Sequence, residues 1–136
     1  MKILFVDDKP VTHAYYRDEL KKDPRYKNCE IELAFDLRDA IDILNKGGMA
    51  EINMVIVDLH LPDSDIPEEL NSYYQKYGKE IRLNEGQLLG LYLRDKGKPY
   101  RYLSAYPNKY RKDWEQAPEP VCLSKEVTAS EFINAL

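Results

Sequence analysis

The sequence has no apolar run long enough to cross a membrane, and its few cysteines are not spaced for a metal site. At the N-terminus, MKILFVDDKP carries one lysine and then only four apolar residues, too few for a signal-peptide core. Its two cysteines, Cys29 and Cys122, lie far apart without CxxC spacing. We interpret them as reduced thiols of a cytoplasmic protein, with one disulfide in a secreted protein as the alternative.

An excess of positive charge is also absent. The chain has 20 Lys and Arg against 24 Asp and Glu, a formal net charge of −4, and the basic residues are scattered. This distribution excludes the basic face expected of a nucleic-acid-binding domain. We therefore expect neither nucleic acid nor membrane as a partner. The length of 136 residues fits one domain, residues 1–136, with enough chain to bury a core.

Short apolar runs alternate along the chain with helical patterns. Continuous apolar runs are typical of strands buried on both faces, and apolar residues three or four positions apart indicate a helix. The predicted strands are 3–6, 31–35, 54–57, 100–104 and 121–123. The predicted helices are 10–20, 37–44, 87–94, 107–116 and a last one that a capping-box spacing, Thr128 to Glu131, would start.

Two of these helices have an apolar stripe that can be named. The helix at 37–44 has a regular one, and Gly47 and Gly48 are expected to end it. The helix that Pro10 opens has a less regular stripe, and we expect His13 on its surface. The two stripes are Leu37, Ala40, Ile41 and Leu44, and Val11, Ala14, Tyr15 and Leu20.

The alternation predicts an α/β fold of five βα units. Strands joined by helices pair in parallel through right-handed crossovers, so helices cover both faces of the sheet. We expect a flavodoxin-like (βα)₅ three-layer sandwich with a central parallel sheet in the order 2-1-3-4-5.

Residues 63–85 do not fit this alternation and are predicted to be an insertion between the third strand and the third helix. They are too many for an ordinary connection of about 2–6 residues. A short surface helix is expected over 66–77. Because added length at a connection costs little entropy, the sequence predicts that 64–82 is dispensable for folding. Tyr73, Tyr74 and Tyr77 form either a small packing cluster or a partner-binding surface.

Three carboxylates follow the ends of two predicted strands: Asp7 and Asp8 after the first, and Asp58 after the third. In open α/β sheets the ligand site lies beyond the carboxyl ends of the strands at the switch point, which the first and third strands flank. The three acids should therefore converge. Clustered carboxylates repel one another, and Mg²⁺ is a cation that such a group binds.

Ser104 ends the fourth predicted strand, and Lys125 follows the fifth. With these residues in place the sequence resembles the response-regulator receiver domains of two-component systems. The matching segments are ILFVDD (3–8), MVIVDLHLPD (54–63), YLSA (102–105) and LSK (123–125). The resemblance covers the chain except for the 63–85 insertion.

The resemblance implies a role for each of these residues. Asp58 would be the phosphoacceptor, Lys125 would pair with the phosphate, and Ser104 would be the switch hydroxyl. Mg²⁺, or Mn²⁺ in its place, would be bound by Asp58, by Asp8 directly, by Asp7 through a water and by the backbone carbonyl of His60. The phosphoryl group would come from a histidine kinase or phosphotransfer protein, the changed surface would act on an unidentified downstream protein, and dimerisation is compatible with this role.

Several residues depart from the family pattern. Glu126 stands where most members have a proline, and Cys122 stands where many have a switch aromatic. Together with the insertion, these departures bear on the output face and not on the phosphorylation chemistry. His60 and Tyr106 correspond to positions that flank the path of water to the acyl phosphate. Because both are large, the sequence predicts slow dephosphorylation. The alternative for the His60 side chain is a metal ligand.

Two other functions remain open at this point. One is an Mg²⁺-dependent phosphohydrolase that forms an aspartyl phosphate, although such enzymes usually carry a DxD pair and Asp58-Leu59-His60 lacks the second acid. The other is a receiver-like binding module that never becomes phosphorylated. We expect a self-phosphorylating switch with no turnover of an external substrate.

Overall fold

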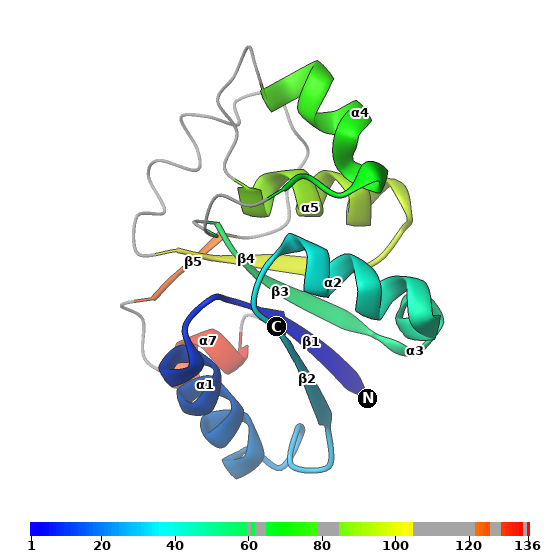
Figure 1. Ribbon diagram of the computed structural model, residues 1–136. Helices are drawn as coiled ribbons and strands as arrows, with labels where there is room; N and C mark the ends of the chain where they lie inside the picture. Colours follow the sequence, from blue (N-terminus) through cyan, green and yellow to red (C-terminus); the bar gives the residue numbers. More distant parts are fainter. Residues whose placement is uncertain (60, 62–64, 79–84, 105–121, 126–128, 135) are drawn as a thin grey trace.

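Five parallel strands form one sheet in the order β2-β1-β3-β4-β5, as predicted (Figure 1). The computed structural model describes residues 1–136 except 60, 62–64, 79–84, 105–121, 126–128 and 135. The strands are β1 (Lys2–Val6), β2 (Glu30–Ala34), β3 (Met54–Asp58), β4 (Tyr100–Ser104) and β5 (Cys122–Ser124). The α helices are α1 (Pro10–Lys22), α2 (Leu37–Ile43), α3 (Met49–Glu51), α4 (Asn71–Tyr73), α5 (Glu85–Asp95) and α7 (Ala129–Asn134).

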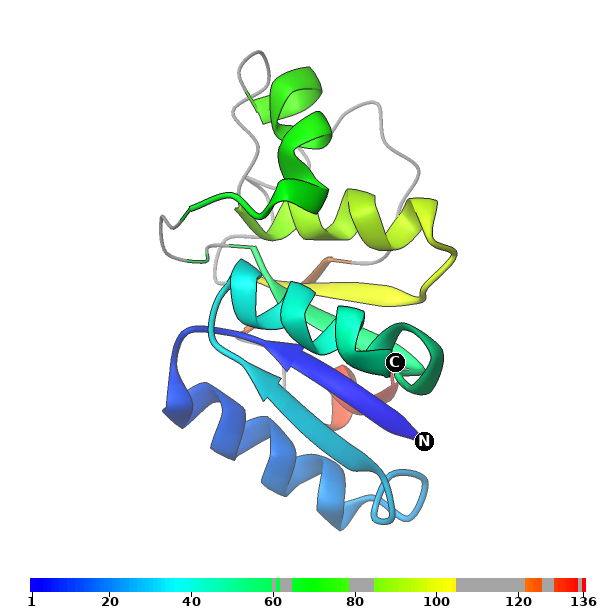
Figure 2. The same ribbon diagram turned by 45° about the vertical axis from the view of Figure 1, so that its right-hand side comes forward.

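Helices cover both faces of the sheet (Figures 1 and 2). The sheet divides the core into two apolar clusters. On β1, Ile3 and Phe5 point into the cluster under α1 and α7, whereas Leu4 and Val6 point into the cluster under α2 and α5. This alternation follows from the two-residue period of a strand. All four are almost fully buried, which explains why the strand is a continuous apolar run. The predicted three-layer arrangement is confirmed.

The regular stripe of α2 is confirmed, since all four of its residues are buried. Gly47 adopts a φ of 97°, which glycine tolerates well, and interrupts the helix as predicted. The chain then makes the one further turn of α3, which the sequence did not predict.

The predicted stripe of α1 is wrong at Val11 and Tyr15, although Leu20 is buried as predicted. Val11 is 82% exposed and Tyr15 49%, whereas the buried residues are His13, Tyr16 and Leu20. Their spacing also marks one helical face, but a histidine was not expected on it. Phe35, assigned to the second strand, lies just beyond Ala34, where the strand ends, and is exposed. The predicted helix 107–116 lies outside the described residues.

The insertion contains a helical segment, residues 68–78, formed by a 3₁₀ turn (Glu68–Leu70), α4 and a π turn (Tyr74–Gly78). It lies on the side of α5 that faces away from the sheet (Figures 1 and 2). The Tyr73 hydroxyl donates a hydrogen bond of 2.5 Å to Asp95 Oδ2, and its ring packs edge-on against Tyr92. The side chain of Asn45 donates a second hydrogen bond, 3.0 Å long, to Glu69.

This segment also contributes to the core, so the predicted surface helix does more than cover the surface. Leu70 is fully buried in the α2–α5 cluster. Covered on both sides, α5 has eight consecutive buried residues, from Gly86 to Leu93. Tyr73 belongs to a packing cluster, one of the two alternatives for the tyrosines, whereas Tyr74 is partly exposed and the side chain of Tyr77 lies outside the described part.

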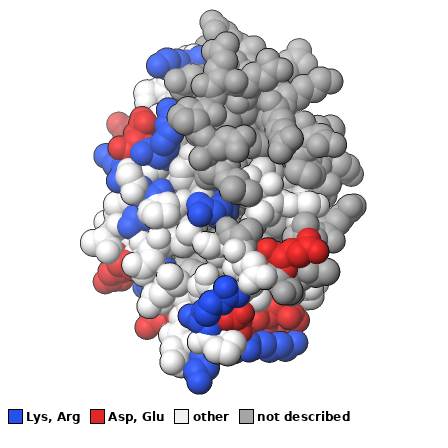
Figure 3. Space-filling view, turned by 180° about the vertical axis from the view of Figure 1, so that it is seen from behind, with Lys and Arg blue, Asp and Glu red and all other residues white. Residues whose placement is uncertain are grey.

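Within the described residues, no helix is both long and apolar enough to span a membrane. Both cysteines are free, and they belong to different clusters, Cys29 to the one under α1 and Cys122 to the one under α5. The sheet between them explains the absence of a disulfide. On the face seen in Figure 3, described Lys and Arg side chains are interspersed with Asp and Glu and do not form a separate basic patch.

The burial of Leu70 predicts that the insertion is not dispensable for folding. Leu70→Ala should lower the free energy of unfolding by about 2–5 kcal/mol, because it leaves a cavity in the core. Asn71→Ala, at the exposed neighbouring position, should change it by less than about 0.5 kcal/mol. Denaturant titration measures both values. Equal stability of Leu70→Ala and the unmodified chain would show that the segment does not stabilise the core.

Candidate functional site

The site lies at the carboxyl edge of the sheet, where four strands deliver one or two polar residues each. Asp7 and Asp8 follow β1, Asp58 and Ser104 are the last residues of β3 and β4, and Lys125 directly follows β5. Because all strands are parallel, their ends meet on the same side of the molecule. The structure therefore brings together all five described residues that the sequence predicted for the site.

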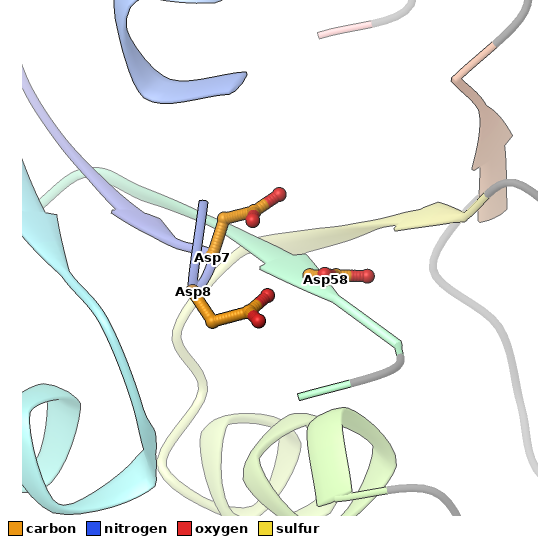
Figure 4. A group of neighbouring side chains, drawn as sticks. All are labelled: Asp7, Asp8 and Asp58. Carbon is orange, nitrogen blue, oxygen red and sulfur yellow. The ribbon is translucent and has the colours of Figure 1, made fainter. Parts of the chain in front are cut away.

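The three carboxylates lie close together, as Figure 4 shows. Asp7, Asp8 and Asp58 each offer an oxygen atom within 4.8 Å of the others. Asp7 and Asp58 are almost fully buried, and Asp8 is half-buried. Asp8 Oδ1 is itself buried and has no hydrogen-bond partner within the described residues.

Lys125 provides positive charge between two of these acids. Its Nζ lies 3.3 Å from Asp7 Oδ2 and 3.3 Å from Asp58 Oδ2. The backbone N–H of Lys125 donates to the carbonyl of Ser104 at 2.8 Å, which fixes the start of this loop to the end of β4. The Ser104 side chain is completely buried at the same edge.

The pKa of the Asp7 carboxyl is raised above its usual value. Burial raises the pKa of this carboxyl most, and the charge of Asp58 raises it further. The backbone N–H of Lys9, which donates to Asp7 Oδ1 at 2.9 Å, and Lys125 act in the opposite direction but do not cancel the increase. The folded protein therefore stores an unfavourable interaction at this edge.

These residues fit a divalent cation. The ligand set consists of hard carboxylate oxygens, which Mg²⁺ and Mn²⁺ prefer. Three carboxylates and one ammonium leave two negative charges when all are ionised, the charge that one divalent cation neutralises. The buried Asp8 Oδ1, which lacks a donor, supplies an acceptor for such an ion. His60, whose carbonyl was predicted as a further ligand, lies outside the described residues, as does Tyr106.

Gly86 also shapes the site, although no sequence pattern predicted it. Its N–H donates to the carbonyl of Leu59 at 3.3 Å, so the first turn of α5 packs on the backbone next to Asp58. A Cβ atom at this position would come within 2.2 Å of the Asp58 carbonyl oxygen. Only glycine allows this approach. The available signal was a glycine, a weak helix former, directly before the predicted helix 87–94.

The stored repulsion predicts that Asp58→Asn stabilises the metal-free protein by about 1 kcal/mol, since removal of one charge relieves Asp7 and Asp8. The raised pKa of Asp7 also predicts a pH dependence. A carboxyl that binds its proton more tightly in the folded state contributes to the free energy of unfolding at low pH. The protein loses this contribution as the pH rises through the raised pKa. The free energy of unfolding of the metal-free protein should thus decrease between acid and neutral pH. The decrease should be smaller in Asp58→Asn.

Thermal melting in the presence of a chelator tests both statements. Asp42→Asn on the exposed side of α2 is the matched control, because it removes one negative charge away from the site. If Asp42→Asn stabilises the protein as much as Asp58→Asn does, the effect reflects net charge and not a shared site.

Neither a family model nor a curated protein sequence matches the chain. Solved structures do. The N-terminal domain of a response regulator/sensory box/GGDEF three-domain protein from Carboxydothermus hydrogenoformans has a TM-score of 0.70 at 17% identity, and the match covers 99% of this chain and 90% of the other.

Two further structures agree. The two-component transcriptional regulator AraC from Clostridium phytofermentans has a TM-score of 0.65 at 21% identity, covering 100% and 89% of the two chains. The PhyR response-regulator REC domain from Erythrobacter litoralis has a TM-score of 0.68 at 15% identity, covering 98% and 84%. At these identities the likeness establishes the fold, and the chemistry of the site depends on the residues of this chain. The chain has the fold of a response-regulator receiver domain.

Proposed function

We propose that this chain is a phosphoacceptor receiver domain of a two-component or phosphorelay system, in which Asp58 takes a phosphoryl group in an Mg²⁺-dependent reaction. The observation that carries the proposal is the convergence of Asp7, Asp8 and Asp58 with Lys125 at one edge of the sheet. The structural neighbours support it, since several are response regulators or receiver domains.

The arrangement suits phosphoryl transfer to a carboxylate. A carboxylate oxygen of Asp58 attacks the phosphorus of a phosphohistidine, and the bond from phosphorus to the histidine nitrogen breaks. The transition state spreads negative charge over the phosphoryl oxygens, so positioned cations lower its energy. Lys125 supplies one cationic group, which already contacts Asp58. Asp7, Asp8 and Asp58 would hold Mg²⁺, which supplies a second positive centre.

Ser104 and the backbone around it provide a response to the phosphoryl group. The Ser104 hydroxyl can donate a hydrogen bond to a phosphoryl oxygen, and the loop that begins at Lys125 is attached to its carbonyl. A shift of Ser104 towards the phosphate would thus move this loop and change a protein-binding surface. We propose a switch that does not turn over an external substrate and acts in the cytoplasm with a histidine kinase or phosphotransfer protein.

Phosphorylation by a small donor tests the proposed acceptor. Incubation with acetyl phosphate and Mg²⁺ should add one phosphoryl group that is labile to hydroxylamine, measured by intact mass. Asp58→Asn should abolish the addition, while Asp65→Asn, an exposed acid beyond β3, should leave it unchanged. Modification of Asp58→Asn to the same extent would place the acceptor elsewhere. Turnover of a chromogenic phosphate ester would favour the phosphohydrolase instead.

The proposed cation site predicts stabilisation by Mg²⁺. A ligand that binds only the folded state at 100 times its Kd adds about 2.7 kcal/mol to the free energy of unfolding. We expect the melting temperature to rise with Mg²⁺ concentration, and Asp8→Asn to remove most of this rise because it replaces a charged carboxylate by a neutral amide with one oxygen. Asp42→Asn should retain it. A melting temperature indifferent to Mg²⁺ in the unmodified chain would contradict the site.

A further inference from the structure

The backbone at the end of β4 is joined to the backbone that follows the proposed phosphoacceptor. The N–H of Leu59 donates to the carbonyl of Leu103 at 3.1 Å. That carbonyl and the N–H of Ser104 belong to one peptide group, because Ser104 follows Leu103 in the chain. A shift of Ser104 towards a phosphoryl group would therefore move the peptide group to which Leu59 is bonded. Leu59 is completely buried, so it has no solvent to move into.

Leu59 is in turn joined to the start of α5. Its carbonyl accepts a hydrogen bond of 3.3 Å from the N–H of Gly86. The packing here leaves no free space, because a Cβ atom at Gly86 would lie 2.2 Å from the Asp58 carbonyl oxygen and 2.9 Å from Leu59 Cα. Closely packed groups transmit a displacement and do not absorb it. The first turn of α5 must therefore follow a movement of the backbone at Asp58 and Leu59.

A second contact joins β4 to the middle of α5. Tyr102 lies two residues before Ser104, on the same face of β4, and is completely buried. Its hydroxyl lies against the backbone of Gly90, where a Cβ atom would come within 1.7 Å of the hydroxyl oxygen. The tyrosine fits in this place because position 90 is glycine. The strands that end in Asp58 and Ser104 thus both contact α5, each at a position where a side chain would clash.

The far end of α5 holds the inserted segment, residues 68–78, on its outer side (Figure 2). Tyr73 donates its hydrogen bond of 2.5 Å to Asp95, the last residue of α5, and its ring packs edge-on against Tyr92 at a centroid distance of 6.5 Å. Burial and the bonded Asp95 carboxylate raise the pKa of Tyr73 to about 12, so its hydroxyl remains a donor at neutral pH. Leu70 anchors the same segment in the α2–α5 cluster. One helix therefore contacts the phosphoacceptor backbone at its start and the inserted segment at its end.

We propose that phosphorylation of Asp58 weakens the packing of segment 68–78 on α5, which makes this segment a phosphorylation-dependent surface of the domain. The inference rests on the proposed function. The unphosphorylated protein packs α5 closely at Gly86 and Gly90, so a displaced β4 fits the helix less well. Two sites that are coupled through one element affect each other by the same factor. Weaker packing of the segment must therefore favour the phosphorylated state in return.

Hydrogen exchange of the backbone amides measures the packing of the segment. The probe is beryllofluoride with Mg²⁺, which mimics a phosphoryl group on a carboxylate and binds reversibly. A ligand that stabilises the folded protein slows exchange in the chain as a whole, so faster exchange in one segment identifies local weakening. We expect the amides of 68–78 to exchange about fivefold faster with the probe, and those of β2 to exchange no faster. Asp58→Asn should show no acceleration.

Reciprocity provides a second test, on the segment itself. Tyr73→Phe keeps the ring and removes the hydrogen bond to Asp95. It should lower the melting temperature and yet reduce the Kd for beryllofluoride about two- to fivefold, because a loosened segment favours the bound state. Asp95→Ala and the double variant should give the same Kd, since each removes the same interaction. The matched controls, Tyr15→Phe on α1 and Asp42→Ala on α2, should leave the Kd unchanged.

The outcomes distinguish this inference from the proposed function. If the unmodified chain binds beryllofluoride but exchange in 68–78 is not accelerated, or the Kd is not reduced in Tyr73→Phe, the coupling is overturned and the proposed function stands. A lower melting temperature with an unchanged Kd in Tyr73→Phe is the pattern of a contact that only stabilises the fold. If the unmodified chain neither binds beryllofluoride nor accepts a phosphoryl group, the proposed function fails and the coupling fails with it.

Discussion

The contact of Lys125 with two buried carboxylates is the interaction on which the site depends. A single ammonium lies 3.3 Å from an oxygen of Asp7 and from one of Asp58, and both acids are shielded from water. Such a pair of acids would repel strongly without a cation between them. One lysine does not balance three carboxylates, however, and the raised pKa of Asp7 reflects the remaining repulsion. The carboxylates that destabilise the metal-free protein are thus the same groups that would bind a cation.

Much of this arrangement could be predicted from the sequence, because each site residue follows a strand. The runs before Asp7 and Asp58 are continuous and apolar, so the strand ends were well marked, and the parallel topology then places the acids together. Pairwise contacts were less predictable. The position of Gly86 against the Asp58 carbonyl depends on where α5 packs on the sheet. Because a long insertion precedes α5, no local sequence pattern predicts that position.

The error in the stripe of α1 and the continuous burial of α5 have one physical origin, which is that packing partners distant in sequence decide which residues are buried. On α1, Phe5 and Phe35 enclose His13, while Val11 faces solvent. On α5, eight consecutive residues are buried because the helical segment 68–78 covers the outer side. Any protein that approaches α5 from this side therefore meets the segment, with Tyr74 partly exposed and Tyr73 turned inward.

Burial of polar side chains lowers the stability of a fold, and in this protein such residues are concentrated in one region. Among the described residues these are Asp7, His13, Asp58, Gln87 and Ser104. Three stand at the carboxyl ends of strands, and the other two lie in the first turns of α1 and α5, which start from the same edge. The rest of the core consists of two apolar clusters on either side of the sheet. Burial of apolar surface in these clusters stabilises the fold and offsets the cost of the polar edge. A protein selected for stability alone would replace such residues, so their concentration at one edge is itself an argument that this edge is the functional site.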